Sequence, residues 1–338
     1  MSFFDSVRND LFFIAEIGGN HEGDFDYAVR LTQLAIESGA DAVKYQIYSG
    51  DTLVSRIEGA DRNRHMKKFE LGQDNYLKLA DMCHQAGVAF MASVWDLAAL
   101  EWADPYIDIH KVGSGDVTAW PLIRWMVGTK KPIILSTGLC SVGEIRRTLE
   151  YINGLDPSYI AKRKLALLQC TTSYPCPDKD ANLAAMEFLT REFGLPVGYS
   201  DHTIGDDAAF AAAVLGAEIM EMHFTDNRDD KTFRDHAVSI TLEETQLLLA
   251  RISRARTLKG SAVKEPVTSE VDAGHLTSFR RSIYAACSIK KGELLSANNM
   301  TVLRPEHGIP AWRFDELVGR HAARDMIPHE VFTEDDVI

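Results

Sequence analysis

The sequence predicts an α/β protein, a (β/α)8 TIM barrel followed by a small β-rich domain. Short apolar runs alternate with amphipathic segments at helical spacing, which is typical of parallel α/β architecture. Eight such units occupy about 250 residues, the usual length of a (β/α)8 barrel. A doubly wound open sheet shows the same alternation and is the alternative fold.

The predicted strands are apolar runs bounded by glycine, proline or polar residues. They span residues 11–18, 42–48, 88–95, 109–115, 132–138, 164–171, 196–202 and 218–224. Segments at helical spacing lie between them. The clearest predicted helices are residues 26–40, 142–154 and 206–217.

A long predicted helix, residues 241–260, ends the catalytic barrel, which we assign to residues 1–260. The polar stretch 261–277 predicts a linker. Residues 278–338 contain short strands and turns with little helical periodicity, so they predict a small β-rich domain. A domain of that size has a limited core and would gain stability from docking onto the barrel or a second subunit.

The composition is that of an ordinary folded protein, with 46% hydrophobic and 25% charged residues among 338. The net charge of -13 argues against a nucleic-acid partner, because phosphate backbones are met by clustered Lys and Arg. No apolar run approaches the roughly 20 residues of a membrane span, and the amino terminus lacks the features of a signal peptide. We therefore expect a cytoplasmic protein without a membrane partner. Its five widely spaced cysteines predict free thiols.

Polar side chains stand at the carboxyl end of nearly every predicted strand. In a (β/α)8 barrel these ends converge on one bowl, where the active site lies. Alternate residues of a strand share a face, so Ser200 and His202 point to the same side. The strand-end residues are Glu16, Asn20, His21, Lys44, Gln46, Ser93, Lys111, Ser114, Asp116, Ser136, Thr137, Thr172, Tyr174, Ser200, Asp201, His202, Glu221 and His223.

The strand-end residue types indicate an anion site and a metal site. Two lysines and several serine hydroxyls suit a compact phosphate and carboxylate. His202 and His223, on adjacent strands with acids nearby, suit a divalent metal of the Mn, Fe or Zn kind. A single histidine at a strand end is more often a hydrogen-bonded structural residue than a metal ligand, and Asp201 alone could cap a helix. Such structural roles do not require polar residues at the ends of nearly all the strands, so the pattern favours a functional site. The histidines without such support, expected to be structural or surface residues, are His65, His84, His110 and His236.

With these residues in order, the chain resembles the sialic acid synthase family, the phosphoenolpyruvate-dependent nonulosonate synthases. Its segments match the family in order and spacing, namely IAEIGGNHEGD, AVKYQ, HKVGSGDVTAWPLI, KPIILSTG, LLQCTTSYPCP, GYSDHTIG and EMHFTD. Residues 280–309 resemble its antifreeze-like (SAF) domain. One such motif is weak, but the ordered set is specific. The resemblance implies a transferase that condenses phosphoenolpyruvate, an open-chain mannosamine-type sugar and water into a nine-carbon 2-keto acid and phosphate.

The resemblance also implies a role for individual residues. His202 and His223 would bind the metal, Mn²⁺ first, with Mg²⁺ or Co²⁺ as alternatives. Tyr174 would contact the sugar. Family members are domain-swapped homodimers, and Arg304 would reach the site of the partner chain. The catalytic residues would be Glu16, Gln46, Asp116 and Glu221, and the phosphoenolpyruvate-binding residues Lys44, Ser93, Lys111, Ser114, Ser136, Thr172 and Ser200.

Several departures from the family pattern leave the acceptor sugar open. The segment TDNRDDKTFRDH after His223 lacks the family's Gly-Pro-Asp turn, and Asp235 is the candidate for its sugar-facing aspartate. Gln169 replaces a family histidine, and the loop 50–66 does not match clearly. N-acetylmannosamine is the first expected acceptor, and a diacetamido-trideoxyhexose or mannose would give a legionaminate, pseudaminate or Kdn synthase. Outside the family, a pyruvate aldolase and a carbohydrate-binding or ice-binding protein are the alternatives.

Overall fold

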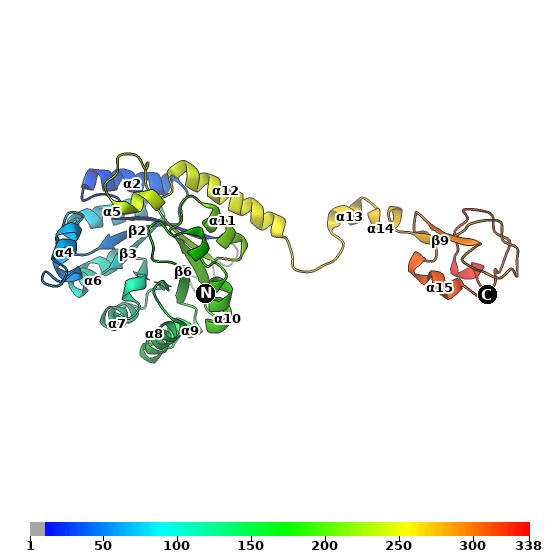
Figure 1. Ribbon diagram of the computed structural model, residues 1–338, viewed down its shortest axis with the longest axis horizontal. Helices are drawn as coiled ribbons and strands as arrows, with labels where there is room; N and C mark the ends of the chain where they lie inside the picture. Colours follow the sequence, from blue (N-terminus) through cyan, green and yellow to red (C-terminus); the bar gives the residue numbers. More distant parts are fainter. Residues whose placement is uncertain (1–10) are drawn as a thin grey trace. The chain divides into compact units, whose positions relative to one another are not determined.

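The computed structural model describes residues 11–338 and divides the chain into two compact units, one ending at Lys259 and one running from Gly260 to Ile338 (Figure 1). In the first unit eight parallel strands pair in chain order, and the last pairs with the first to close a barrel. The predicted (β/α)8 barrel is confirmed and the open sheet is excluded. The strands are β1 (Phe12–Gly18), β2 (Ala42–Ile47), β3 (Ala89–Val94), β4 (Ile109–Val112), β5 (Ile133–Ser136), β6 (Leu165–Cys170), β7 (Val197–Asp201) and β8 (Ile219–His223).

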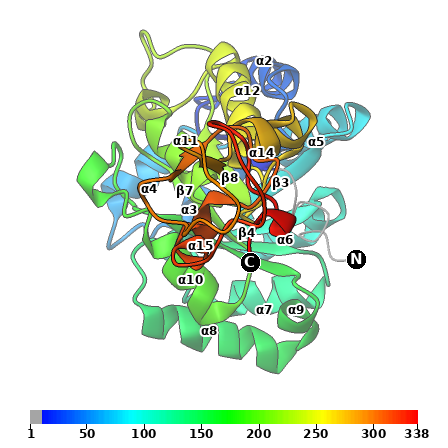
Figure 2. The ribbon, with the colours of Figure 1, turned by 90° about the vertical axis from the view of Figure 1, so that its right-hand side faces the viewer.

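Helices cover the outside of the barrel (Figures 1 and 2). They are α2 (Phe25–Glu37), α3 (Gly50–Leu53), α4 (Ala60–Lys67), α5 (Gln73–Gln85), α6 (Leu97–Ala103), α7 (Trp120–Gly128), α8 (Val142–Leu155), α9 (Ser158–Ala161), α10 (Ala185–Phe193), α11 (Asp207–Val214) and α12 (Leu242–Lys259). Short 3-10 helices are η1 (Asp104–Tyr106), η2 (Ser114–Asp116), η3 (Asp178–Asp180), η4 (Arg234–Val238), η5 (Ala311–Arg313) and η6 (Glu334–Asp336). Within residues 11–338, no helix has the length and apolar character needed to cross a membrane.

Local sequence signals determine where several helices begin. Asp24 caps α2 by accepting a hydrogen bond from the Tyr27 amide, and Asp96 caps α6 in the same way. Ser141 and Glu144 form a capping box at the start of α8. Such caps satisfy amides that have no partner inside the helix, and each contributes about 1 kcal/mol. The loops that lead from strand to helix therefore end at defined points, which fixes the strand-end residues of the site.

The barrel has an inner and an outer hydrophobic layer. The inner layer is formed by strand residues that face the barrel axis, including Ile14, Met91 and Ile134. The larger outer layer lies between the strands and the helices. Gly198 on β7 marks a close approach, because a Cβ atom there would lie 2.2 Å from the carbonyl oxygen of Ile219 on β8. The strands that carry the later part of the site therefore pack tightly against each other.

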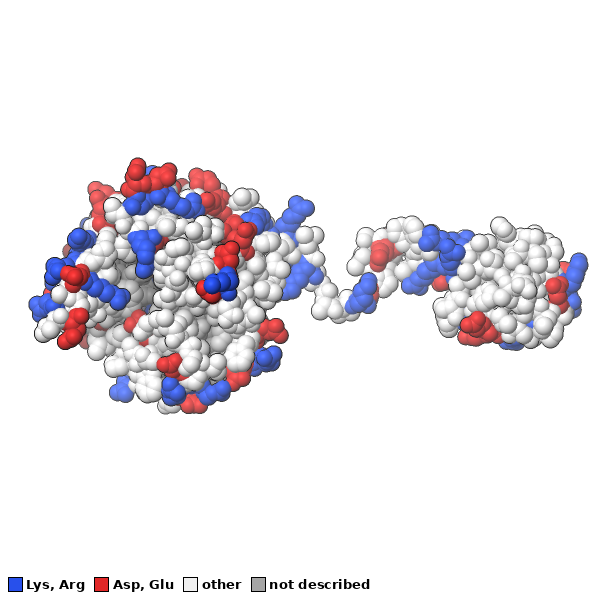
Figure 3. All heavy atoms as spheres, in the orientation of Figure 1, with Lys and Arg blue, Asp and Glu red and all other residues white. Residues whose placement is uncertain are grey.

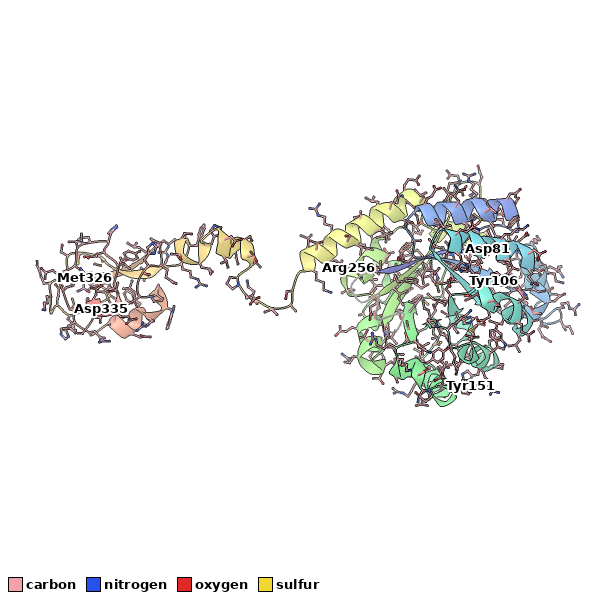
Figure 4. All side chains as sticks on the ribbon, turned by 180° about the vertical axis from the view of Figure 1, so that it is seen from behind. Asp81, Tyr106, Tyr151, Arg256, Met326 and Asp335 are labelled. Atoms are coloured by element: carbon pink, nitrogen blue, oxygen red, sulfur yellow. The ribbon has the colours of Figure 1, made fainter. Side chains whose placement is uncertain are left out.

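The second unit has its own core and a small antiparallel sheet. Its elements are α13 (Thr268–Asp272), α14 (His275–Ser278), β9 (Ser282–Ala285), β10 (Met300–Leu303) and α15 (Phe314–Leu317). The first two are short helices that lie within the stretch expected to be a linker, except for Ser278, the last residue of α14. Ile283, Phe332 and Met326, the last of which is labelled in Figure 4, belong to its buried core.

Candidate active site

A cavity of about 820 Å³ lies at the carboxyl ends of the barrel strands. All the catalytic, substrate and metal residues predicted from the sequence line it except Arg304, which belongs to the second unit. The predicted residues that line it are Glu16, Lys44, Gln46, Ser93, Lys111, Ser114, Asp116, Ser136, Thr172, Tyr174, Ser200, His202, Glu221, His223 and Asp235.

The expectation that all strand-end residues converge is wrong for four of them. Asn20, His21, Thr137 and Asp201 do not line this cavity, because local hydrogen bonds take up their side chains. The Thr137 hydroxyl donates to the carbonyl of Leu168 at 3.0 Å. The Asn20 side-chain amide donates to the Phe224 carbonyl and to Ser239 Oγ. His21 Nδ1 accepts a hydrogen bond from the Gly23 amide, and Asp201 Oδ1 accepts one from the Thr203 amide.

The floor of the cavity is a buried cluster of two lysines and two glutamates. Lys44 Nζ lies 2.6 Å from Glu16 Oε2 and 3.6 Å from Glu221 Oε2. Lys111 Nζ lies 3.5 Å from Glu221 Oε1. The pairing of β1 with β2 places Glu16 beside Lys44, so the barrel register itself brings these charges together. Each buried charge thus has an opposite partner, as the cost of desolvation requires.

The shared environment separates the pKa values of the four groups. Burial raises the pKa of Glu16 despite the nearby Lys44. Burial also opposes ionisation of Glu221, but Lys111 and Lys44 outweigh it and lower the pKa of Glu221 to about 2. Burial lowers the pKa of Lys111, whereas Glu16 and Glu221 overcome burial at Lys44 and raise its pKa. Glu221 is therefore the more persistent anion of the two glutamates.

Hydroxyl groups surround the lysines. Lys111 Nζ donates to Ser136 Oγ at 2.7 Å, and Ser200 Oγ donates to Glu221 Oε1 at 3.0 Å. A Cβ atom at Gly138 would lie 2.5 Å from Thr172 Oγ1 and 2.7 Å from Ser114 Oγ. The absence of a side chain at Gly138 thus lets hydroxyls from two loops approach each other. Ammonium and hydroxyl donors in this arrangement can bind a small oxyanion.

His202 and His223 fit a metal site of two imidazoles. His202 Nδ1 lies 2.8 Å from the carbonyl oxygen of Thr171, so Nδ1 donates and Nε2 keeps its lone pair. Burial lowers the pKa of His202 to about 4, which keeps the ring neutral near pH 7. His223 Nδ1 is buried and has no hydrogen-bond partner among residues 11–338, and the two ring centres lie 5.5 Å apart. In that range no three or more His, Cys, Asp or Glu are grouped so that they could hold a metal ion, so the pair has no third protein ligand of these types.

Tyr174 and Asp235 complete the wall beside the histidines. The ring of Tyr174 lies 4.1 Å from that of His202, and Asp235 Oδ2 lies 4.0 Å from His223 Nδ1. Arg234 donates to Asp235 Oδ1 at 2.8 Å. Gln169, which stands where the family has a histidine, is buried and donates to the Ala181 carbonyl at 3.3 Å, away from the cavity.

The cavity also contains residues that the sequence patterns did not identify. Arg62, His65 and Met66 come from α4, Trp95 follows β3, and Arg234 begins η4. His65 had been expected to be a structural or surface residue. These residues lie in loops and on a short helix without a hydrophobic period, so their position depends on the folded barrel.

The fold is a (β/α)8 barrel, and the cavity at its strand ends lies where enzymes of this fold have their active site. The sequence model of the NeuB family matches residues 31–264, and that of the SAF domain matches residues 280–338. The chain belongs to the NeuB family, the nonulosonate synthases whose members include proteins named as sialic, legionaminic and pseudaminic acid synthases.

Individual relatives support this membership over nearly the whole chain. The N,N'-diacetyllegionaminic acid synthase of Campylobacter jejuni is 33% identical over 334 residues, covering 95% of this chain and 98% of that protein. The protein of the same name from Legionella pneumophila is 34% identical over 330 residues, covering 93% of this chain and 91% of that protein. The crystal structure of N-acetylneuraminic acid synthetase from Leptospira borgpetersenii is 30% identical, with a TM-score of 0.73, and covers 79% of this chain and 91% of that one.

Proposed function

We propose that the protein is a transferase that condenses phosphoenolpyruvate with an open-chain mannosamine-type sugar and water, giving a nine-carbon 2-keto acid and phosphate. The observation that carries this proposal is the buried pair Lys44 and Lys111 among hydroxyl groups, which suits a ligand with both a carboxylate and a phosphate. The names of the relatives support the product class, because they include legionaminic, pseudaminic and N-acetylneuraminate-9-phosphate synthases.

The floor of the cavity would bind phosphoenolpyruvate and fix its orientation. Lys44 and Lys111 pair with its anionic groups, and the surrounding hydroxyls donate to the remaining oxygens. Binding both substrates in one cavity places C3 of phosphoenolpyruvate against the aldehyde carbon, which lowers the entropic cost of the reaction. The hydroxyl residues in this role are Ser93, Ser114, Ser136, Thr172 and Ser200.

The proposed reaction forms one carbon–carbon bond and breaks the bond between C2 of phosphoenolpyruvate and its phosphate oxygen. A carbon–carbon bond forms between C3 of phosphoenolpyruvate and the aldehyde carbon, and the aldehyde oxygen takes up a proton. The positive charge left at C2 is quenched by water, which adds its oxygen and releases a proton. The bond between C2 and the phosphate oxygen then breaks while the C2 hydroxyl passes its proton to the departing phosphate, leaving a ketone at C2 and free phosphate.

Two carboxyl groups of the cavity are suited to moving these protons. Burial raises the pKa of both Glu16 and Asp116, so each accepts a proton more readily than an exposed acid. Gln46 donates to Glu16 Oε1 at 3.2 Å and orients that carboxyl. Glu221, whose pKa the lysines lower, stays anionic and keeps Lys44 and Lys111 in place.

A divalent metal, Mn²⁺ or alternatively Mg²⁺ or Co²⁺, would be held by His202 and His223 and would supply Lewis-acid polarisation of the aldehyde oxygen. Asp235 and Tyr174 would contact the sugar beside them. In the homodimer that we propose, Arg304 of one chain reaches the cavity of the other. Its exposed position in the second unit is compatible with that role.

The proposal is tested by phosphate release from phosphoenolpyruvate and Mn²⁺ with N-acetylmannosamine, mannose or a diacetamido-trideoxyhexose, each with and without EDTA. We expect release that requires both a sugar and the metal. Release without sugar, or none with any sugar, would contradict the proposed condensation.

A pyruvate aldolase is the second candidate, because burial lowers the pKa of Lys111, as a Schiff-base lysine requires. Its bond to Ser136 and its contact with Glu221 favour anion binding instead. Borohydride treatment in the presence of pyruvate distinguishes the two functions. An aldolase would be trapped with pyruvate bound to Lys111, whereas the synthase would remain unmodified.

A further inference from the structure

The cavity extends outward beyond the residues assigned to phosphoenolpyruvate. Its outer wall is formed by α4 and by the segment that leads from β8 into η4. Arg62 and His65 come from the first of these elements, and Phe233 and Arg234 come from the second. Neither arginine belongs to the buried charge cluster of the floor, so both are available to bind the acceptor sugar.

Arg234 is held in a fixed orientation at this wall. Its guanidinium group lies 4.1 Å from the centre of the Tyr174 ring, and both Nε and Nη2 lie 2.8 Å from Asp235 Oδ1. Its side chain is nevertheless 64% exposed, and Nη1 has no partner among residues 11–338. A stacked and half-paired guanidinium group of this kind can bind an oxyanion with little further loss of conformational freedom.

Arg62 lacks the ion pair that three neighbouring cations make. Arg56 and Lys67 both pair with Asp51, and Arg64 pairs with Asp61. In the described part of the chain, no carboxylate lies within 4.0 Å of Arg62, although its helix borders the cavity. Acidic and basic side chains are interspersed over the face of the first unit seen in Figure 3, so a cation without an acidic partner at a cavity is informative.

The segment that carries Arg234 is also where this sequence departs from the family's Gly-Pro-Asp turn. Phe233 is packed between the loop after β1 and Phe69: its ring lies 4.7 Å from that of Phe69 and would lie 2.5 Å from a Cβ atom at Gly19. The packed ring fixes the backbone at the start of η4. The cationic side chain that follows it is therefore a built part of the wall.

We propose that the acceptor sugar carries an anionic group, a carboxylate or a phosphate, at the end remote from its aldehyde, and that Arg62 and Arg234 bind it. This inference rests on the proposed condensation and specifies its substrate class. Guanidinium groups match the planar or tetrahedral oxygens of such anions with paired hydrogen bonds. The acids of the lining are already engaged or lie apart from this wall, since Glu16 and Glu221 face lysines and Asp235 faces Arg234.

The test compares three acceptors with phosphoenolpyruvate and Mn²⁺: N-acetylmannosamine, its 6-phosphate and N-acetylmannosaminuronate. We expect kcat/KM for one anionic sugar to exceed that for the neutral sugar at least about tenfold, as a charge-assisted contact provides. The preferred anion identifies phosphate or carboxylate as the group.

Arg62→Gln and Arg234→Gln should each reduce the ratio of anionic to neutral kcat/KM about tenfold. Arg64→Gln, on the same helix but paired with Asp61, should leave the ratio unchanged.

The outcomes separate this inference from the proposed function. If the neutral sugar is turned over as well as or better than both anionic sugars, the inference is overturned and the condensation stands. An unchanged ratio in both the Arg62 and Arg234 variants, or an equal fall in the Arg64 variant, also overturns it. If none of the three sugars supports phosphate release but mannose or a diacetamido-trideoxyhexose does, the inference is overturned and the condensation stands. If no sugar of either panel supports release, the two fail together.

Discussion

Glu221 is the residue on which the charge arrangement of the cavity depends most. It faces Lys44 and Lys111 at 3.6 and 3.5 Å and accepts a hydrogen bond from Ser200. It thereby holds two buried ammonium groups at fixed positions before any ligand enters. Preorganised charge of this kind is the largest contribution that many enzymes make to catalysis.

At the same scale, the two histidines provide the sharpest test of the metal assignment. We expect His202→Ala and His223→Ala each to lower turnover at least about a hundredfold and to reduce retained Mn²⁺, because each removes one imidazole ligand. Metal content after desalting and phosphate release measure the two effects. His84→Gln is the control, since His84 is exposed and bonds Asp108 outside the cavity. Full activity of the His202 variant with added Mn²⁺ would remove His202 from the site.

The segment between β8 and α12 carries three residues of the cavity wall, Phe233, Arg234 and Asp235. Hydrogen bonds from the loop after β1 hold this segment in place. Asn20 donates to the Phe224 carbonyl and to Ser239 Oγ, near the two ends of the segment. Glu22 Oε1 accepts bonds from the Thr232 amide, the Thr232 hydroxyl and the Phe233 amide, at 2.8, 2.9 and 2.8 Å. The motif GGNHEGD therefore positions the wall without entering the cavity.

This arrangement predicts that Glu22→Ala raises KM for the acceptor sugar about tenfold or more, because hydrogen bonds to a charged group stabilise the segment that carries Arg234 and Asp235. KM for phosphoenolpyruvate should change far less, since Lys44 and Lys111 lie on other strands. Glu22→Gln keeps one acceptor oxygen and should restore most of the affinity. Steady-state kinetics with each substrate varied in turn makes the measurement. An equal rise in both KM values would show that Glu22 supports the whole barrel instead.

The elements also show what the sequence can and cannot predict. All eight strands could be located because each is a local apolar run, and the residues at their ends follow from barrel topology alone. Arg62 and Arg234 could not, because α4 and η4 lack a period that distinguishes the face toward the cavity. Asn20 and His21 were misplaced because a strand-end position does not reveal which local hydrogen bonds the side chain makes.

At the scale of the whole molecule, the first unit is held together by contacts between distant parts of the chain. Arg256, labelled near the end of α12 in Figure 4, donates to the Ala217 carbonyl just before β8. His110 is fully buried, with Nε2 3.0 Å from Asp104 Oδ1. Burial lowers the pKa of His110 to about 4, as it does for His21 and His236.

These histidines predict how global stability depends on pH. In the unfolded chain a histidine binds a proton near pH 6.5, whereas folded His110 resists protonation until about pH 4. Its contribution is therefore fully present above pH 6.5 and is lost as the pH falls toward 4, by up to about 3 kcal/mol. Urea unfolding at pH 7 and pH 5 measures the loss. His110→Gln should reduce the difference between the two pH values, and an undiminished difference would contradict the role of His110.

Condensation at the strand ends of this barrel can be followed by mass spectrometry of the sugar product formed from phosphoenolpyruvate and an acceptor that the protein turns over. We expect a product whose mass equals that of the acceptor, phosphoenolpyruvate and water together, less phosphoric acid. An unchanged acceptor, with phosphoenolpyruvate converted only to pyruvate, would contradict it. So would the same product formed from pyruvate in place of phosphoenolpyruvate.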